Sequence, residues 1–179
     1  MSASSASSAR RWARADSAGV NGSPVRVNAN RPVQGDGILR TVPSAGSGAA
    51  NVTWCAVQYM KATGGRIVNV TSRGAYRGEP RHPAYGASKA GLNSFGQSMA
   101  RALAPFGIAV ASVAPGFVET AMARPDLDSG RGEEIRAQSP FNRVATTAEV
   151  AAAVVYLASE QAEWASGAVL DLNGASYLR

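Results

Sequence analysis

Apolar positions in the C-terminal part of the chain gather in short, mainly apolar runs that are separated by longer stretches with helical spacing. Three runs rich in β-branched residues or leucine predict strands: Arg66–Val70, Ile108–Val113 and Ala168–Leu172. Strands that are apolar throughout bury both of their faces, which is typical of a parallel sheet covered by helices. We therefore expect a parallel sheet.

The stretches between these runs carry the end signals of helices. Helices are predicted over Thr53–Ala62, Tyr85–Pro105 and Ala148–Ala158. Gly64 and Pro105 end the first two. Thr146 and Glu149 have the spacing of a capping box, in which each side chain bonds the other's free backbone N–H where the third helix begins. The alternation of strand and helix predicts an α/β fold.

The first fifty residues follow a different pattern. Glycine and proline recur every few positions, and only Val25–Val27 and Ile38–Val42 are predicted as short strands. We expect a low-complexity, irregular or disordered segment over residues 1–50 and a folded domain over residues 51–179. The serine- and arginine-rich start of residues 1–50 also has the composition of a transit peptide, which is the less favoured alternative. No apolar segment follows Arg10-Arg11, so a secretory signal is not indicated and we expect a cytoplasmic protein.

The composition of the chain excludes several classes of protein. The chain has 179 residues and a formal net charge of +6, of which residues 1–50 carry +4 (six Arg, two Asp) and residues 51–179 only +2 (twelve cations, ten acids). A single cysteine, Cys55, excludes a disulfide framework and a cysteine-rich zinc site, and we expect no metal. No run approaches the roughly 18 apolar residues of a membrane helix. A nucleic-acid binder using the arginines near Trp12 is a weak alternative, because no recognition motif accompanies them.

The residues with the clearest chemistry are Tyr85 and Lys89, which lie four positions apart and so share one face of the second predicted helix. A tyrosine phenol ionises at about pH 10, and a nearby ammonium lowers that pKa. Such a pair can pass a proton to or from a substrate oxygen near neutral pH. Ser72 follows the first predicted strand, at the carboxyl edge where open α/β sheets bind ligands, so its hydroxyl can bond the same oxygen. Tyr-x-x-x-Lys alone also occurs by chance on surface helices, so the neighbouring motifs decide.

Three motifs occur in the order and spacing of one known family: Gly65-Arg-Ile-Val-Asn-Val-Thr-Ser72, Tyr85-Gly-Ala-Ser-Lys89 and Pro115-Gly-Phe-Val-Glu-Thr120. Together with the last helix and strand, they resemble the C-terminal portion of the classical short-chain dehydrogenase/reductases, a family of NAD(P)-dependent oxidoreductases. The resemblance covers about residues 53–179. It implies a Rossmann-like, doubly wound parallel sheet.

The resemblance implies a role for each matching residue. Tyr85 is expected to be the general acid/base, Lys89 to lower its pKa and bind the nicotinamide ribose, and Ser72 to polarise the substrate oxygen. The residues expected to face the nicotinamide and its carboxamide are Pro115, Gly116, Val118 and Thr120. The implied cofactor is NAD or NADP, the substrate a small carbonyl or alcohol compound, and the assembly a homodimer or homotetramer.

Residues 121–140 are expected to form the mobile lid that shapes substrate choice. Phe117, Met122 and Phe141 either line the pocket beneath it or pack in the ordinary way. His82, the one histidine, is expected to be a solvated loop residue.

The helices that hold Cys55 and Tyr85 match the helices that pair subunits in the family. Small residues of the second helix would allow two subunits to pack closely: Ala90, Gly91, Gly96 and Ala100. Cys55 itself is expected to be a small buried side chain.

The sequence departs from the family in its front half, which is missing or replaced. The family's Thr-Gly-x-x-x-Gly-x-Gly turn, whose backbone amides hold the cofactor pyrophosphate, does not occur. Ile38–Val42 followed by residues 44–48 mimics a strand and a glycine loop, although a plain linker is favoured. Asn51 lies too near Ser72 to match the family's active-site asparagine and is left unassigned. We expect an incomplete fold that lacks the N-terminal βα units, and the alternative function is a non-catalytic remnant or an oligomerisation partner that cannot bind cofactor.

Overall fold

The computed structural model describes the chain from residue 37 to residue 179, with side chains from residue 48 onward. Three of the predictions above lie outside the described residues: the part of the irregular segment that precedes residue 37, the strand over Val25–Val27 and the arginine cluster beside Trp12. The described residues 37–179 belong to one compact unit. The division between residues 50 and 51 stays a prediction.

The centre of this unit is a parallel sheet of three strands in the order β1 (Gly65–Val70), β2 (Ile108–Pro115) and β3 (Val169–Leu172). Gly65 pairs with Ile108 and Ser112 pairs with Val169. All eight residues of β2 are buried, because β2 is the middle strand and helices cover it on both faces. The predicted parallel sheet and its three strands are confirmed.

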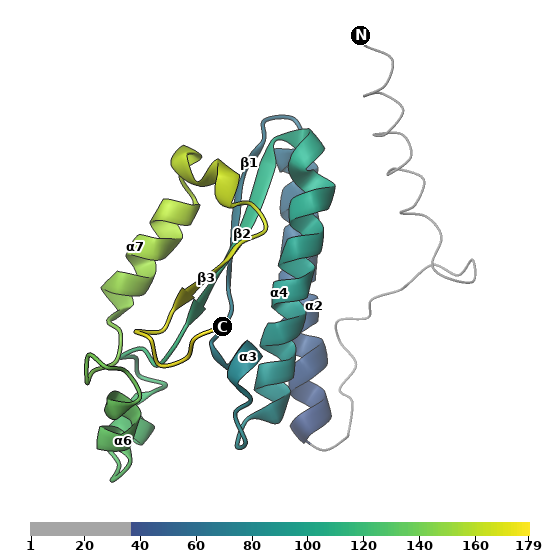
Figure 1. The fold of residues 1–179 in the computed structure, drawn as a ribbon. Coiled ribbons are helices and arrows are strands. Elements are labelled where there is room, and N and C mark those ends of the chain that lie inside the picture. Colours follow the sequence, from purple (N-terminus) through teal and green to yellow (C-terminus); the bar gives the residue numbers. More distant parts are fainter. Residues whose placement is uncertain (1–36) are drawn as a thin grey trace. The chain divides into compact units, whose positions relative to one another are not determined.

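Helices lie on both faces of the sheet (Figure 1). On one face α4 (Pro83–Leu103) packs against β2, and α2 (Gly37–Met60) packs along α4. On the other face α7 (Thr147–Leu157) packs against β1 and β2. The predicted capping box is present: Thr146 Oγ1 accepts the N–H of Glu149 at 3.2 Å, and Glu149 Oε2 accepts the N–H of Thr146 at 2.7 Å.

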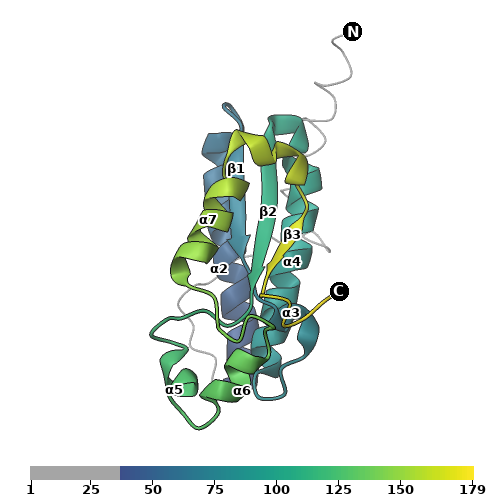
Figure 2. The same cartoon turned by 60° about the vertical axis from the view of Figure 1, so that its left-hand side comes forward.

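Short helices occupy several of the segments between these elements. They are α3 (Gly74–Arg77), α5 (Arg124–Leu127), α6 (Gly132–Ala137) and two 3₁₀ helices, Ala104–Phe106 and Glu160–Ala165. Figure 2 shows α3, α5 and α6 beyond the carboxyl ends of β1 and β2, toward which the strand arrows point. No helix in the described part of the chain is both long and apolar enough to cross a membrane.

α2 begins well before the predicted helix at Thr53, so two predictions are wrong. Ile38–Val42 is helical rather than a strand, and residues 44–48, predicted as a plain linker in preference to a glycine loop, lie inside the same helix. Local breakers such as Pro43 weaken a helix but do not decide it, since packing supplies most helical stability in proteins. Here α2 gains that packing along α4.

The core lies on both sides of β2. On the α4 side it contains Val57, Ala100, Leu103, Ile108 and Val110, and on the α7 side Ala111, Val113, Leu157 and Ala162. Thr53 and Val57 of α2 are 5% and 1% exposed. Cys55 lies between them in sequence, and about 100° of rotation per residue turns it to the opposite face of the helix. Cys55 is therefore exposed, and the prediction that it is buried is wrong.

Two of the small residues assigned to subunit packing face inward instead. Ala100 belongs to the core, and a β-carbon on Gly96 would lie 2.8 Å from Asn69 Nδ2 and 3.2 Å from Ser112 Oγ. Gly96 therefore serves the close approach of α4 to the sheet. Gly91 is exposed, with nothing within 4 Å of a β-carbon placed there.

Candidate active site

Ser72 lies where the chain leaves β1 and enters α3. The N–H of the next residue, Arg73, donates to the carbonyl oxygen of Pro115 at 2.8 Å, which ties this turn to the end of β2. Ser72 Oγ accepts the N–H of Gly74 at 3.0 Å. The hydroxyl is thus held at the carboxyl edge of the sheet, where the sequence placed it.

Tyr85 lies in the first turn of α4 and is 40% exposed. A β-carbon on Gly74 would lie 3.4 Å from Ser72 Oγ and 3.8 Å from Tyr85 Cδ1, so Gly74 borders both side chains. A β-carbon on Gly86 would lie 2.9 Å from the carbonyl oxygen of Gly74. Gly86 therefore lets α3 and α4 approach closely, and Gly74 lies between the tyrosine ring and the serine hydroxyl.

Lys89 lies one turn further along α4, on the face that holds Tyr85. Its Nζ donates to the carbonyl oxygen of Val70 at 3.0 Å and lies 5.6 Å from the centroid of the Tyr85 ring. Burial lowers the pKa of the half-buried Lys89 ammonium. Because an ammonium carries three N–H donors, further donors remain for a partner beside the phenol. The structure thus brings Lys89 and Tyr85 together.

The segment from Pro115 to Thr120 leaves β2 at the same edge. The N–H of Gly116 donates to the carbonyl oxygen of Leu172 at 3.0 Å, and a β-carbon on Gly116 would lie 3.1 Å from the β-carbon of Asn173. Val118 forms an isolated parallel bridge with Ala145. Thr120 Oγ1 accepts the N–H of Ala123 at 3.3 Å. The four residues expected to face the nicotinamide therefore form a fixed loop beside the end of β3.

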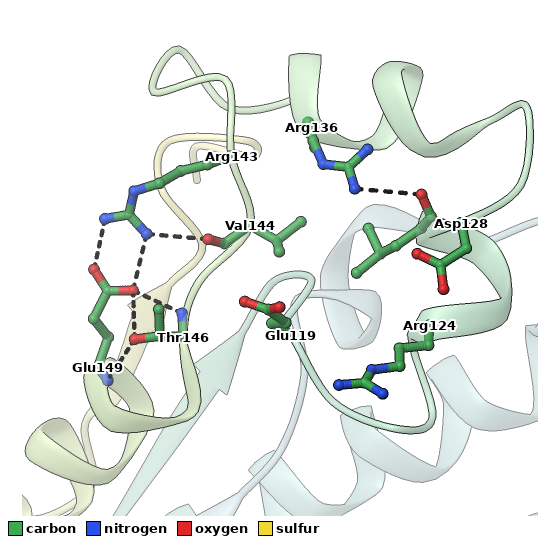
Figure 3. Close-up of a pocket in the computed structure, with 9 residues that line it drawn as sticks. Glu119, Arg124, Asp128, Arg136, Arg143, Val144, Thr146 and Glu149 are labelled. Carbon is green, nitrogen blue, oxygen red and sulfur yellow. Dashed lines mark hydrogen bonds and ion pairs between the residues drawn. The ribbon is translucent and has the colours of Figure 1, made fainter.

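A hollow of about 450 Å³ lies between this loop, the predicted lid and the start of α7 (Figure 3). Arg143 bonds both carboxylate oxygens of Glu149, at 2.6 and 2.9 Å, and this lowers the pKa of Glu149 to about 2. Arg124 and Glu119 also line it, and in Figure 3 their side chains come from facing segments. The predicted catalytic residues do not line this hollow. It is a charged site that the sequence motifs did not indicate.

A second hollow, of about 480 Å³, lies between the predicted lid, α7 and the C-terminal segment. Phe117 and Phe141 line it, together with Arg73. Met122 is 89% exposed and is not part of this lining. His82 is exposed just before α4, as predicted.

The described residues fit the nicotinamide end of a dinucleotide better than its phosphates. At the nicotinamide end, the half-buried Lys89 offers donors and the loop from Pro115 is fixed at the carboxyl edge. Residues 44–48 lie inside α2, where backbone N–H groups point along the helix axis to carbonyls and do not form a phosphate loop. No group of three or more His, Cys, Asp or Glu side chains is placed to hold a metal ion within the described range.

Comparison with known proteins decides the family. A family model described as enoyl-(acyl carrier protein) reductase matches residues 13–174. The chain belongs to the short-chain dehydrogenase/reductase family. Nodulation protein G of Rhizobium meliloti is 42% identical over 117 residues, which are 65% of this chain and 47% of that protein. The 3-oxoacyl-(acyl-carrier-protein) reductase FabG of Escherichia coli is 42% identical over 119 residues, 66% of this chain and 48% of that protein.

Solved structures of the short-chain dehydrogenase/reductase family agree with the fold. A short-chain dehydrogenase/reductase from Brucella melitensis superimposes with a TM-score of 0.72 at 30% identity, over 79% of this chain and 57% of that one. ElxO with NADP bound superimposes with a TM-score of 0.63 at 30% identity, over 68% and 50%. The incomplete Rossmann-like fold is thus confirmed for the described residues. This chain spans about half the length of the curated relatives that it matches.

Proposed function

We propose that this chain is the catalytic portion of an oxidoreductase that transfers a hydride between NAD or NADP and a carbonyl or alcohol carbon. The observation that carries the proposal is the meeting of Ser72, Tyr85 and Lys89 at one edge of the sheet, through the close packing of Gly74. The relatives support it: FabG is named a 3-oxoacyl reductase, and ElxO is described with NADP bound. Which of the two nicotinamide cofactors this chain uses is left open.

In this proposal the bound nicotinamide supplies or accepts the hydride, and the side chains handle the proton. In the reductive direction the Tyr85 hydroxyl donates its proton to the substrate oxygen as that oxygen gains charge. The Lys89 ammonium favours the resulting phenolate by its positive charge. The Ser72 hydroxyl donates a hydrogen bond to the same substrate oxygen and orients it.

Cofactor contacts are proposed for the matching residues of the site. Lys89 would bind the ribose hydroxyls with the donors that Val70 does not use. The loop of Pro115, Gly116, Val118 and Thr120 would face the nicotinamide and its carboxamide, since the loop is fixed by its bonds to Leu172 and Ala145. Residues 121–140 would cover the substrate.

The test is oxidation of NADH and NADPH in the presence of a panel of small ketones. Tyr85→Phe removes only the phenolic oxygen and is expected to lower turnover by at least about a hundredfold, the usual share of general acid catalysis. Tyr156→Phe, at a tyrosine that is 53% exposed on α7, is the matched control and should retain activity. Equal turnover by the wild type and Tyr85→Phe would contradict the proposal.

A second candidate function is a non-catalytic remnant or oligomerisation partner that keeps the site but cannot hold the cofactor. It is favoured by the helical path of residues 44–48, which forms no phosphate-binding loop. Calorimetric titration with NADH and NADPH separates the two. Saturable binding at millimolar or lower concentration supports the enzyme, and no heat of binding supports the remnant.

A homodimer or homotetramer is proposed from the outer faces of α2 and α4. Val52 and Tyr59 on α2 are 70% and 83% exposed, and Gly91 leaves open space on α4. Sedimentation equilibrium measures the assembly. A Tyr59→Glu variant that sediments as a smaller species than the wild type would support this surface. A cytoplasmic location remains part of the proposal.

A further inference from the structure

Arg73, the residue after Ser72, is a buried cation that the proposed mechanism does not use. It is 4% exposed, and burial together with the neighbouring Arg77 lowers the pKa of its guanidinium. A buried charge is costly unless other groups pair with it. The partners of Arg73 therefore indicate what it is held for.

The guanidinium of Arg73 contacts three segments that are far apart in the sequence. Its Nη1 donates to Ser176 Oγ at 2.6 Å, in the last residues of the chain. Its Nη2 pairs with Glu79 Oε1 at 3.3 Å, in the segment between α3 and α4. The guanidinium also lies 5.5 Å from the ring centroid of Phe117, in the loop that follows β2. The Arg73 side chain thus joins the C-terminal segment, the segment between α3 and α4 that leads to Tyr85, and the loop proposed for the nicotinamide.

The contact with Ser176 continues to the nicotinamide loop by a second route. Ser176 Oγ donates to the carbonyl oxygen of Asn173 at 2.7 Å, so the same hydroxyl accepts from Arg73 and donates onward. Asn173 packs against Gly116, where a β-carbon would lie 3.1 Å from that of Asn173. Arg73 therefore reaches the nicotinamide loop by two routes. It lies directly against Phe117, and it acts through Ser176 and Asn173 on Gly116.

The C-terminal segment, residues 173–179, is held in a conformation that a free chain end would avoid. Ala175 has φ of 58°, in the left-handed region that a residue with a β-carbon rarely adopts. Ser139 Oγ donates to the carbonyl oxygen of Gly174 at 2.6 Å, and the guanidinium of Arg179 lies 4.1 Å from the ring centroid of Tyr76. A strained residue persists only where its surroundings hold it in place.

We propose that Arg73 is a positioning residue that couples the C-terminal segment to the nicotinamide loop and to the turn that carries Ser72. The catalytic meaning of this coupling rests on the proposed function. Arg73 itself touches neither substrate nor cofactor in this account. It acts by fixing the relative positions of Phe117, Ser176 and the backbone beside Ser72.

Hydrogen exchange followed by mass spectrometry tests the coupling without requiring activity. Arg73→Met keeps much of the buried stem and removes the guanidinium, and it should speed exchange locally in residues 116–118 and 173–179. Arg77→Met is the matched control: Arg77 is an exposed neighbour that bonds Gln138, and those two segments should exchange as in the wild type. Unchanged exchange in Arg73→Met, or an increase spread evenly over the whole chain, would overturn the proposal.

Ser176→Ala provides a second route if Arg73→Met does not fold. It removes the hydroxyl that Arg73 bonds and should speed exchange in residues 116–118 as well as at the chain end. Faster exchange at the chain end alone would contradict the coupling.

Kinetics with the nicotinamide cofactor then show what the coupling serves. Arg73→Met and Ser176→Ala should each lower kcat and raise the cofactor KM, and the double variant should be no worse than Arg73→Met alone, because both act on one path. Arg73→Lys, which keeps the charge but not the fork, should restore the function only in part. Additive losses would overturn the path. If the wild type has no turnover, the proposed function fails, while the exchange result still decides the coupling.

Discussion

Two regions at the carboxyl edge of the sheet carry clustered polar groups, and they are built in opposite ways. The candidate active site rests on backbone packed so closely that Gly86 has no room for a side chain against the carbonyl oxygen of Gly74, and its Lys89 is half buried. The hollow of Figure 3 is held by the exposed ion pair of Arg143 and Glu149. Exposed pairs contribute little to stability, because water and salt screen their attraction. Close packing between backbone segments therefore indicates the candidate active site better than a high density of charged side chains does.

The largest expected effect comes from removing the Lys89 ammonium. Lys89→Met should lower the kcat of ketone reduction by about a hundredfold or more, because no ammonium remains beside the phenol of Tyr85 to stabilise the negative charge left by proton transfer. Lys61→Met, at the only other lysine of the chain, is the control. Steady-state kinetics of both variants check this, and an unchanged kcat for Lys89→Met would separate Lys89 from the proton transfer.

Adding one carbon at Gly86 should break the packing that assembles the site. Gly86→Ala places a β-carbon 2.9 Å from the carbonyl oxygen of Gly74, and overpacking of this kind costs about 1–3 kcal/mol. Gly91→Ala is the matched control in the same helix, since open space surrounds it, and alanine there should stabilise by up to about 1 kcal/mol. Urea unfolding measures both. Equal stabilities would show that α3 and α4 can separate at little cost.

The ion pair that lines the charged hollow should make the stability of the fold depend on pH. Substitution of the catalytic residues should leave this dependence unchanged. The ion pair holds the pKa of Glu149 at about 2, below its ordinary value of 4.5. Since the folded-state pKa is the lower one, the pair stabilises the fold above about pH 4.5, and this contribution is lost as the pH falls toward 2. Thermal unfolding at a series of pH values should show a flatter acid limb for Glu149→Gln than for Glu133→Gln. Parallel curves would mean that the pair is not formed in solution.

The smallest effect is expected at Cys55, which lies outside both regions. Because it is exposed in the single chain, on the face of α2 that also holds Val52 and Tyr59, its thiol should react with Ellman's reagent at dilutions where the protein sediments as a monomer. Cys55→Ser should then change the free energy of unfolding by no more than about 0.5 kcal/mol. A thiol that reacts only in denaturant would place it in an interface or in the core.

The elements that were predicted well from the sequence are those in which a local residue pattern is compatible with only one structure. The apolar run over Ile108–Val113 became the buried middle strand, and Thr146 with Glu149 formed the capping box. The spacing from Tyr85 to Lys89 placed both side chains on one face of α4, as helical geometry requires.

The parts that the sequence missed depend on packing between distant segments. Pro43 and the nearby glycines indicate a break, yet residues 37–52 are helical and α2 packs along α4. The sequence does not show which face of α2 is buried, because Cys55 is as well suited to burial as Thr53 and Val57, which are the residues that the structure buries. Nothing in the sequence singles out Arg73, since its partner Ser176 lies 103 residues away. None of these contacts has a local signature.

The central claim is that this site guides hydride transfer to a carbonyl carbon. The most direct measurement uses NADH or NADPH deuterated on one face of C4, with a ketone that the chain reduces, and mass spectrometry of the alcohol. We predict one deuterium on the carbinol carbon from one of the two labelled faces and none from the other, with at least about a hundredfold less product from Tyr85→Phe in the same time. Alcohol that carries hydrogen from solvent on that carbon, or no alcohol from the wild type with either cofactor, would contradict the account.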